Sequence, residues 1–305
     1  MTILVAGSSG LVGSAIVREL VRLGEQYVGI SRKELDLTNR DATFNFIKSI
    51  KPEKVIDAAA IVGGINANNK NPVQFLSKNI QIQTNLMDAS HEFGVKRFVF
   101  LGSSCMYPRD SIQPISEDSL MTGMLEETNA AYAIAKIAGL ELIRSYRKEF
   151  KHKWITVIPN NIYGPYDNFH RNTSHVFAAL ISKFTNAVRY KKPAVILWGT
   201  GKPLREFLHS DDAAKAIMVC LQEYDDDKPI NIGTSNELSI KDLAEKIAKA
   251  TNFKGEIVWD QSFPDGIMRK SLEVNKIKSM GWNAQISIEE GIESTIKWYN
   301  SSRLD

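Results

Sequence analysis

Short apolar runs alternate with segments of helical periodicity along the first half of the chain. Residues 3–6 form an apolar run that predicts a strand, and apolar positions spaced by three or four residues as far as Gly24 then predict a helix. Further strands are expected at 27–30, 55–59, 97–101 and 154–158, with helices at 41–50, at 72–93 and around Tyr132. Strands that are apolar throughout and separated by helices indicate a parallel sheet covered on both faces. We therefore expect an α/β fold built on a doubly wound parallel sheet, the Rossmann arrangement.

The pattern loosens after Pro165. Helices are expected at 176–189 and 211–224, and strands at 195–198 and 230–233. We interpret this part as a second, smaller mixed α/β domain for the substrate, with the chain crossing between the domains more than once. The predicted division assigns 1–165 with 205–233 to a dinucleotide-binding domain, and 166–204 with 234–305 to a sugar-nucleotide domain.

Composition and charge narrow the class of protein. The 305 residues are 43% hydrophobic and 24% charged, as in an ordinary globular protein with one large or two modest domains. A net charge of +3 gives no argument for nucleic acid or a membrane as partner. The chain has two cysteines, no basic leader before its first strand, and no apolar run of the ~18 residues that cross a bilayer. We therefore expect a soluble protein of the reducing cytoplasm, without a metal site.

A glycine-rich turn links the first predicted strand to the first predicted helix. There, backbone N–H groups and the positive end of the helix can hold a pyrophosphate, and glycine lets the ligand approach the backbone. A plain tight turn is the alternative, because glycine triplets alone are weak evidence. Its place between strand and helix predicts a dinucleotide site formed by Gly7, Ser8, Ser9, Gly10, Leu11, Val12 and Gly13.

The residues after the second strand bear on the choice of cofactor. NAD sites usually present an acidic side chain there, whereas the additional phosphate of NADP requires cations. Arg32 and Lys33 therefore favour NADPH/NADP as the cofactor, and the nearby Glu34 and Asp36 leave NAD open.

Tyr132 and Lys136 lie four residues apart on a predicted helix, so that phenol and ammonium share one face. The ammonium is expected to stabilise phenolate and to lower the pKa of the phenol, normally ~10, toward the working range of an acid–base catalyst. Such a pair is common on any amphipathic helix. A catalytic role for this pair is favoured because Ser103 follows the strand 97–101 at the carboxyl edge of the sheet, where ligands of such folds bind.

This constellation resembles the extended short-chain dehydrogenase/reductase superfamily, and longer segments resemble its GDP-L-fucose synthase family. These segments are Ala59–Ile65, Phe100–Pro108, Tyr132–Gly139, Asn161–Phe169, Ser174–Val176, Arg205–Asp212 and Pro264–Gly266. The reaction implied by the resemblance is the NADPH-dependent conversion of GDP-4-keto-6-deoxy-D-mannose to GDP-L-fucose. It inverts carbons 3 and 5 of the sugar and then reduces the ketone at carbon 4. We therefore expect a bifunctional epimerase/reductase that binds a GDP-sugar.

The resemblance also implies roles for individual residues. In the reduction, Tyr132 donates a proton, Lys136 lowers its pKa and binds the nicotinamide ribose, and Ser103 hydrogen-bonds the ketone oxygen. In the inversions, Cys105 and His175 match the family's acid–base pair. The implied cofactor contacts are Leu101, Gly102, Ser103, Ser104, Lys136, Pro159, Asn160, Asn161, Ile162 and His175. The implied substrate contacts are Lys183, Trp198, Arg205, Asp265 and Lys270.

Some positions qualify this interpretation. Lys183 and Ser9 stand where related sequences carry arginines near the substrate and the NADP phosphate. Asp265, in Pro-Asp-Gly, is equally well explained as a turn residue. Cys220 is expected in the core and His209 in a structural role.

Two other functions stay open at this point. The first is a reductase or epimerase of a related 4-keto sugar nucleotide, which inverts one carbon or none. The second is a non-catalytic dinucleotide-binding sensor on the same scaffold. A homodimer formed through helices that include the Tyr132 helix is also implied by the resemblance.

Overall fold

The computed structural model describes residues 2–170, 173–263 and 265–302. Pro264, the first residue of the Pro-Asp-Gly segment, lies outside these ranges. Among the described residues, no helix is both long and apolar enough to pass through a bilayer.

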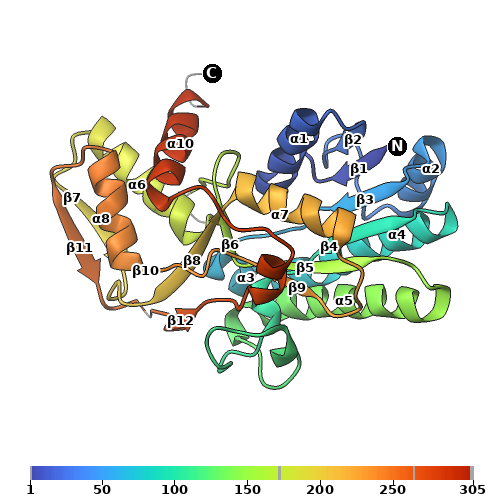
Figure 1. The fold of residues 1–305 in the computed structure, drawn as a ribbon. Coiled ribbons are helices and arrows are strands. Elements are labelled where there is room, and N and C mark those ends of the chain that lie inside the picture. The colour runs from blue at the N-terminus through green and yellow to red at the C-terminus, as the bar shows by residue number, and fades with distance from the viewer. Residues whose placement is uncertain (1, 171–172, 264, 303–305) are drawn as a thin grey trace.

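Six parallel strands form the main sheet, in the order β2-β1-β3-β4-β5-β9 (Figure 1). They are β1 (Ile3–Ala6), β2 (Tyr27–Ile30), β3 (Lys54–Asp57), β4 (Arg97–Leu101), β5 (Ile155–Pro159) and β9 (Ile230–Ile232). Successive side chains of a strand face opposite sides of the sheet, and here both sides are apolar. In β1, Ile3 and Val5 lie in one core, and Leu4 and Ala6 lie in another. The predicted doubly wound sheet is confirmed.

Helices cover both faces of this sheet (Figure 1). On one face are α1 (Leu11–Leu23) and α7 (Ser210–Glu223), which pack against each other. On the other are α2 (Arg40–Ile50), α4 (Asn79–Glu92) and α5 (Ala130–Phe150). The long α5 carries Tyr132 and Lys136, as predicted, and begins at the end of the sheet where β4 also ends.

The helix predicted at 72–93 is present, but a π-helical turn at Gln74–Lys78 interrupts it. The buried Asn79 explains this turn, because its amide Nδ2 donates to the carbonyl of Phe75 at 2.7 Å. The same side chain accepts from the backbone N–H of Ile61 at 2.8 Å. A short helix that the sequence did not predict, α3 (Ile65–Lys70), precedes this segment.

Among the described residues, two smaller sheets and four further helices follow in the second half of the chain (Figure 1). One sheet contains β6 (Asn161–Tyr163), β8 (Leu204–His209), β10 (Glu237–Ser239) and β12 (Arg269–Lys270), and the other contains β7 (Ala194–Trp198) and β11 (Glu256–Asp260). The helices are α6 (Val176–Arg189), α8 (Ile240–Ala250), α9 (Asn275–Ser279) and α10 (Ile288–Ser301). Short 3-10 turns lie at Ser104–Met106, Glu117–Ser119 and Glu127–Asn129.

Much of this part has its own apolar core, which includes Phe177, Phe184, Phe207 and Leu243. The chain enters it through β6, returns to the main sheet with α7 and β9, and then leaves again. The segment 205–233 contributes a strand to each of two sheets. β8 pairs with β6, β10 and β12 in a smaller sheet, whereas β9 joins the main sheet. The boundaries proposed between the two domains stay a prediction.

Candidate active site

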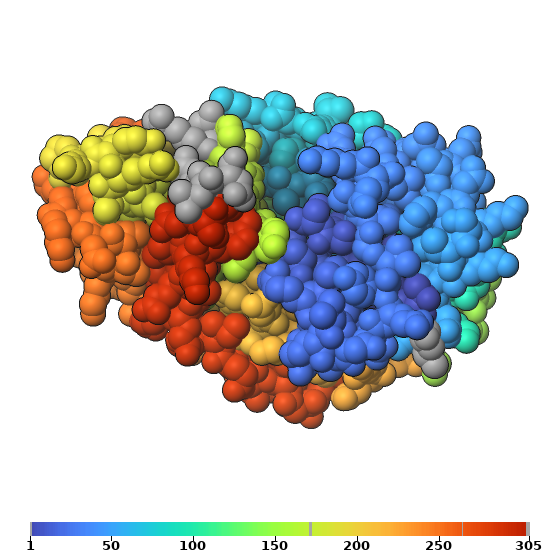
Figure 2. Space-filling model, turned by 90° about the horizontal axis from the view of Figure 1, so that it is seen from above, coloured from blue at the N-terminus to red at the C-terminus, as the bar shows by residue number. Residues whose placement is uncertain are grey.

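The candidate residues gather beyond the carboxyl ends of the main strands. In the space-filling view, the blue N-terminal residues and the yellow, orange and red residues form two masses with a recess between them (Figure 2). Parallel strands bring all their carboxyl ends to one edge, so the loops after β1, β2, β4 and β5 meet on this side.

The glycine turn after β1 is as tight as its sequence predicts. Gly7 has a φ of +78°, a conformation that other residues rarely adopt. A Cβ at Gly13 would lie 2.0 Å from the carbonyl oxygen of Gly7, so a side chain there would displace the turn. Gly10 caps α1 without a side-chain hydrogen bond. The first amides of α1 thus border an open, side-chain-poor surface, which fits a pyrophosphate.

The loop after β2 presents exposed cations. Arg32 and Lys33 are exposed, whereas the nearby carboxylates are engaged locally. Glu34 accepts from the backbone N–H of Ser31 at 2.7 Å, and this hydrogen bond lowers its pKa. Asp36 accepts from the backbone N–H and hydroxyl of Thr38. The arrangement therefore favours a ribose phosphate over a free ribose hydroxyl pair.

Lys136 is fixed inside the protein, with 3% of its surface exposed. Its Nζ donates to the carbonyl oxygen of Leu101 at 2.8 Å and lies 4.6 Å from the centre of the Phe100 ring. Burial lowers the pKa of Lys136 to about 8, and the charge of Asp57 opposes that shift. The ammonium is therefore held at the end of β4, beside the loop that carries Ser103.

The expectation of a lowered pKa for Tyr132 is wrong for the protein alone. Burial raises the pKa of the phenol, and the nearby Cys105 and Asp57 raise it further, although a hydrogen bond with Ser103 acts in the opposite direction. Desolvation disfavours the phenolate more than the surroundings stabilise it. Tyr132 is thus a neutral proton donor at physiological pH, the form needed to protonate an alkoxide.

Cys105 belongs to a 3-10 turn that Ser103 caps. The Ser103 hydroxyl accepts from the backbone N–H of Cys105 at 3.3 Å, which ties the two side chains to one turn. The amide Nδ2 of Asn129 donates to the Cys105 sulfur at 3.4 Å. No sequence motif marks Asn129, although it lies three residues before Tyr132, one helical turn away.

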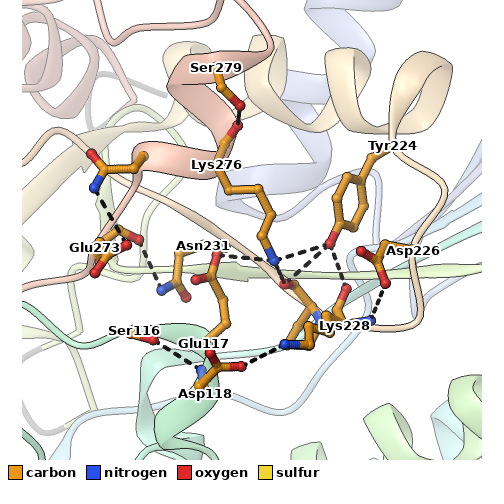
Figure 3. A network of polar contacts seen from close by, with 12 residues as sticks. Ser116, Glu117, Asp118, Tyr224, Asp226, Lys228, Asn231, Glu273, Lys276 and Ser279 are labelled. Carbon is orange, nitrogen blue, oxygen red and sulfur yellow. Dashed lines mark hydrogen bonds and ion pairs between the residues drawn. The ribbon is translucent and has the colours of Figure 1, made fainter.

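A polar network behind the site anchors the end of this turn. The buried hydroxyl of Tyr107 donates to Asn231 of β9 at 2.6 Å. The backbone N–H of Asn231 in turn donates to Glu117 at 3.0 Å, and its side chain donates to the carbonyl of Glu273 at 3.1 Å. Lys276 completes the network around Glu117 (Figure 3). The turn with Cys105 is thus braced against the main sheet and α9.

His175 forms the N-terminal cap of α6. The preceding residues dock on the loop after β3, where the backbone N–H of Gly64 donates to the carbonyl of Thr173 at 3.0 Å. Phe75 lies against the same loop and packs edge-on to Tyr132, with ring centres 6.3 Å apart. Desolvation by the surrounding protein lowers the pKa of the His175 imidazole.

Two cations lie side by side on neighbouring strands of the smaller sheet. Arg205 of β8 is in register with Lys270 of β12. Next to them, the fully buried Glu206 accepts from the side chain of Asn160 at 2.7 Å and from the backbone N–H of Leu272 at 3.0 Å. The pair of cations suits a diphosphate, and Glu206 fixes the strands that carry it.

The cofactor residues implied after β5 have structural contacts as well. Asn160 and Asn161 bind the side chain and the backbone carbonyl of Glu206, so their amides join the main sheet to the smaller one. Pro159 ends β5 and Ile162 lies in β6, which places this backbone at the same edge as the glycine turn.

An aromatic platform lies at the far end of the smaller part. Trp198 stacks on Phe263, with ring centres 4.4 Å apart, and is 58% exposed. The Lys183 ammonium lies 5.7 Å from the Trp198 ring. An exposed indole of this kind can stack on a nucleobase.

Hydrogen bonds from Thr200 hold the side chain of Asp265 in place. Its two carboxylate oxygens accept from the backbone N–H and the hydroxyl of Thr200, at 2.6 and 2.7 Å, and these bonds lower its pKa. These bonds join Asp265 to a residue 65 positions earlier in the chain and not to its own turn, so the turn role and the substrate contact both stay predictions.

Comparisons with known proteins agree with this geometry. A family model described as the NAD dependent epimerase/dehydratase family matches residues 3–233. "Probable GDP-L-fucose synthase 1" of Oryza sativa subsp. japonica is 46% identical over 299 residues, covering 97% of this chain and 91% of that protein. The GDP-L-fucose synthase of Escherichia coli (strain K12) is 43% identical over 307 residues, covering 97% and 96%. A GDP-L-fucose synthetase from Naegleria fowleri, solved bound to NADP, superimposes with a TM-score of 0.92 at 30% identity, covering 99% and 95%.

Proposed function

Because this chain belongs to the NAD dependent epimerase/dehydratase family and, within it, to the GDP-L-fucose synthases, we propose that it is an NADPH-dependent epimerase/reductase. Its substrate is GDP-4-keto-6-deoxy-D-mannose and its product is GDP-L-fucose. Carbons 3 and 5 of the sugar are inverted first, and the ketone at carbon 4 is reduced afterwards.

One observation carries the proposal: a thiol and a proton-donating phenol share a site. Cys105 acts on the pKa of Tyr132, and both residues interact with Ser103. A simple reductase needs the phenol and its lysine but has no use for a thiol at this place. An enzyme that first removes and returns protons does need a second acid–base group.

The inversions use the acidity that the ketone confers on its neighbouring carbons. Cys105 approaches the sugar from the turn after β4, and His175 approaches from the start of α6. Inversion requires removal of a proton on one side of the carbon and its return on the other, so two groups from separate elements suit it. The amide of Asn129 stabilises a thiolate at Cys105 through its hydrogen bond.

The reduction uses the other half of the site. Hydride comes from NADPH bound at the glycine turn with its ribose phosphate beside Arg32 and Lys33. Tyr132 donates its proton to the oxygen at carbon 4, which Ser103 also hydrogen-bonds. Lys136 holds its positive charge next to this site.

The nucleotide end of the substrate lies over the smaller sheets. Arg205 and Lys270 bind the diphosphate, and Trp198 stacks on the base. Lys183, close to the Trp198 ring, adds positive charge at this end.

We also propose a cytoplasmic homodimer that associates through helices that include α5, the Tyr132 helix. Ile134 of α5 is 47% exposed, which supports a contact on this helix. A light-scattering mass equal to that of one chain would contradict the dimer.

Incubation with GDP-4-keto-6-deoxy-D-mannose and NADPH, followed by NMR analysis of the product, tests the function. We expect GDP-L-fucose and stoichiometric NADPH oxidation. GDP-rhamnose or GDP-deoxytalose would instead indicate a reductase that inverts neither carbon 3 nor carbon 5. Binding of NADPH without turnover would favour the sensor.

A further inference from the structure

The main sheet contains one more buried ionisable group close to the reduction site. Asp57 is the last residue of β3 and is 1% exposed. One carboxylate oxygen accepts from the backbone N–H of Ala59 at 3.1 Å. The other, Oδ2, is buried and has no hydrogen-bond partner among the described residues. A buried carboxylate in this state is costly unless a cation lies nearby.

The register of the sheet places Lys136 as that cation. Asp57 of β3 is paired in register with Phe100 of β4, so their side chains lie next to each other on the same face of the sheet. The Lys136 ammonium lies over the Phe100 ring and is also buried. The two opposite charges therefore occupy one enclosed space between β3, β4 and α5.

We propose that Asp57 is a positioning residue of the reduction site, whose buried carboxylate serves as the counter-ion that keeps the Lys136 ammonium charged and in place. This inference rests on the proposed reduction. It predicts that loss of Asp57 acts on catalysis through Lys136, without removing any contact to substrate or cofactor.

The other groups named around Lys136 supply no second negative charge, so Asp57 is its counter-ion. From α4 comes the neutral amide of Gln83, which donates to the carbonyl of Ala135 at 2.7 Å. Lys78, of the π-helical turn that packs on α5, acts on Asp36 at the surface. Tyr132 of α5 and Cys105 of the 3-10 turn lie on the substrate side, and burial keeps Tyr132 neutral at pH 7 by raising its pKa.

The sign of the expected effect follows from the charges. Asp57 raises the pKa of Lys136, which burial has lowered to about 8. Removing the carboxylate lets the ammonium lose its proton at a lower pH. The alkaline limb of the pH profile of kcat/KM should then move toward neutrality, because the charged lysine is the active form.

The test compares the pH profiles of NADPH oxidation for the wild type and Asp57→Asn. We expect the alkaline limb of the variant to shift to lower pH by about one unit or more. Asp212→Asn is the matched control, since Asp212 is also 1% exposed but binds the backbone N–H groups of Gln285 and Ile286. Its profile should keep the wild-type limb. An unshifted limb in folded Asp57→Asn would overturn the proposal.

A comparison of thermal stability tests the pairing of Asp57 with Lys136 without any substrate. Lys136→Met leaves the Asp57 carboxylate buried without its cation, so adding Asp57→Asn to that variant should raise its melting temperature by about 3 °C or more. A double variant no more stable than Lys136→Met would refute the pairing. Because this measurement is independent of turnover, failure of the proposed GDP-sugar reaction would be recognised separately.

Discussion

The amide nitrogen of Asn129 lies 3.4 Å from the sulfur of Cys105 and donates a hydrogen bond to it. The other amide atom, Oδ1, is buried and has no partner among the described residues. Asn129 closes the last 3-10 turn before α5, so the helix that carries the reductase pair also supports the thiol. In the proposed mechanism, inversion and reduction thus both depend on α5 and the turn that precedes it.

Replacing Asn129 with alanine should impair inversion before reduction. A hydrogen bond to a charged group contributes about 1.5–3 kcal/mol, so we expect incorporation of solvent deuterium at carbons 3 and 5 to slow by at least about tenfold. NMR of the sugar after incubation in D₂O measures this rate. Thr128→Ala is the control, because the Thr128 hydroxyl contacts Glu126. Equal exchange rates in Asn129→Ala and wild type would show that the bond does not activate the thiol.

Tyr132→Phe should separate the two half-reactions. The variant keeps the ring that packs on Phe75 but lacks the proton donor, so NADPH oxidation should fall by about 100-fold or more. Deuterium exchange into the sugar should persist, since Cys105 and His175 remain. Stopped-flow absorbance and NMR exchange report on the two steps separately. Reduction at the wild-type rate would require another proton donor.

How much of this site the sequence predicts depends on whether a feature is local. The glycine turn, the strands of the main sheet and the Tyr132 helix follow from short periodic patterns, and all three are present. The strands β6, β8, β10 and β12 have two to six residues each, and long-range pairing defines them more than any local signal. Their periodicity is too short to predict a strand.

The surroundings of individual side chains cannot be predicted from local sequence, because residues distant in the chain create them. The spacing of Lys136 and Tyr132 predicts a lowered pKa for the phenol, whereas burial sets the direction in which both pKa values shift, and Asp57 from another strand acts on both. Asn129 and Asp57 carry no motif that marks them in the sequence. Both acquire meaning only when the fold places them beside Cys105 and Lys136.

Cofactor preference can be tested at the loop after β2. Replacing Arg32 and Lys33 together with serine removes the exposed cations next to the proposed ribose phosphate. We expect the KM for NADPH to rise by about tenfold or more, with little change for NADH, because exposed charge-assisted contacts contribute about 1 kcal/mol each. Lys51→Ser, which removes a cation after α2, is the control. An equal loss for both cofactors would place the phosphate elsewhere.

Glu206→Gln should destabilise the protein, because this carboxylate accepts several hydrogen bonds where two sheets meet. Its oxygens accept from the backbone N–H groups of Thr234, Ser235 and Leu272 and from the amide of Asn160. A glutamine turns one acceptor into a donor that faces other donors, so we expect a loss of about 2–3 kcal/mol in urea unfolding. Glu237 is in register with Glu206 on β10 but forms an exposed ion pair with Arg269.

The matched Glu237→Gln variant should therefore lose less than about 1 kcal/mol. If the two variants were equally stable, the buried hydrogen bonds of Glu206 would not hold the sheets together. Since Glu206 adjoins Arg205 and fixes the strand segment after Lys270, Glu206→Gln should also raise the KM for the GDP-sugar more than it lowers kcat. A fall in kcat alone would indicate that the displaced strands disturb the reacting carbons and leave the diphosphate site intact.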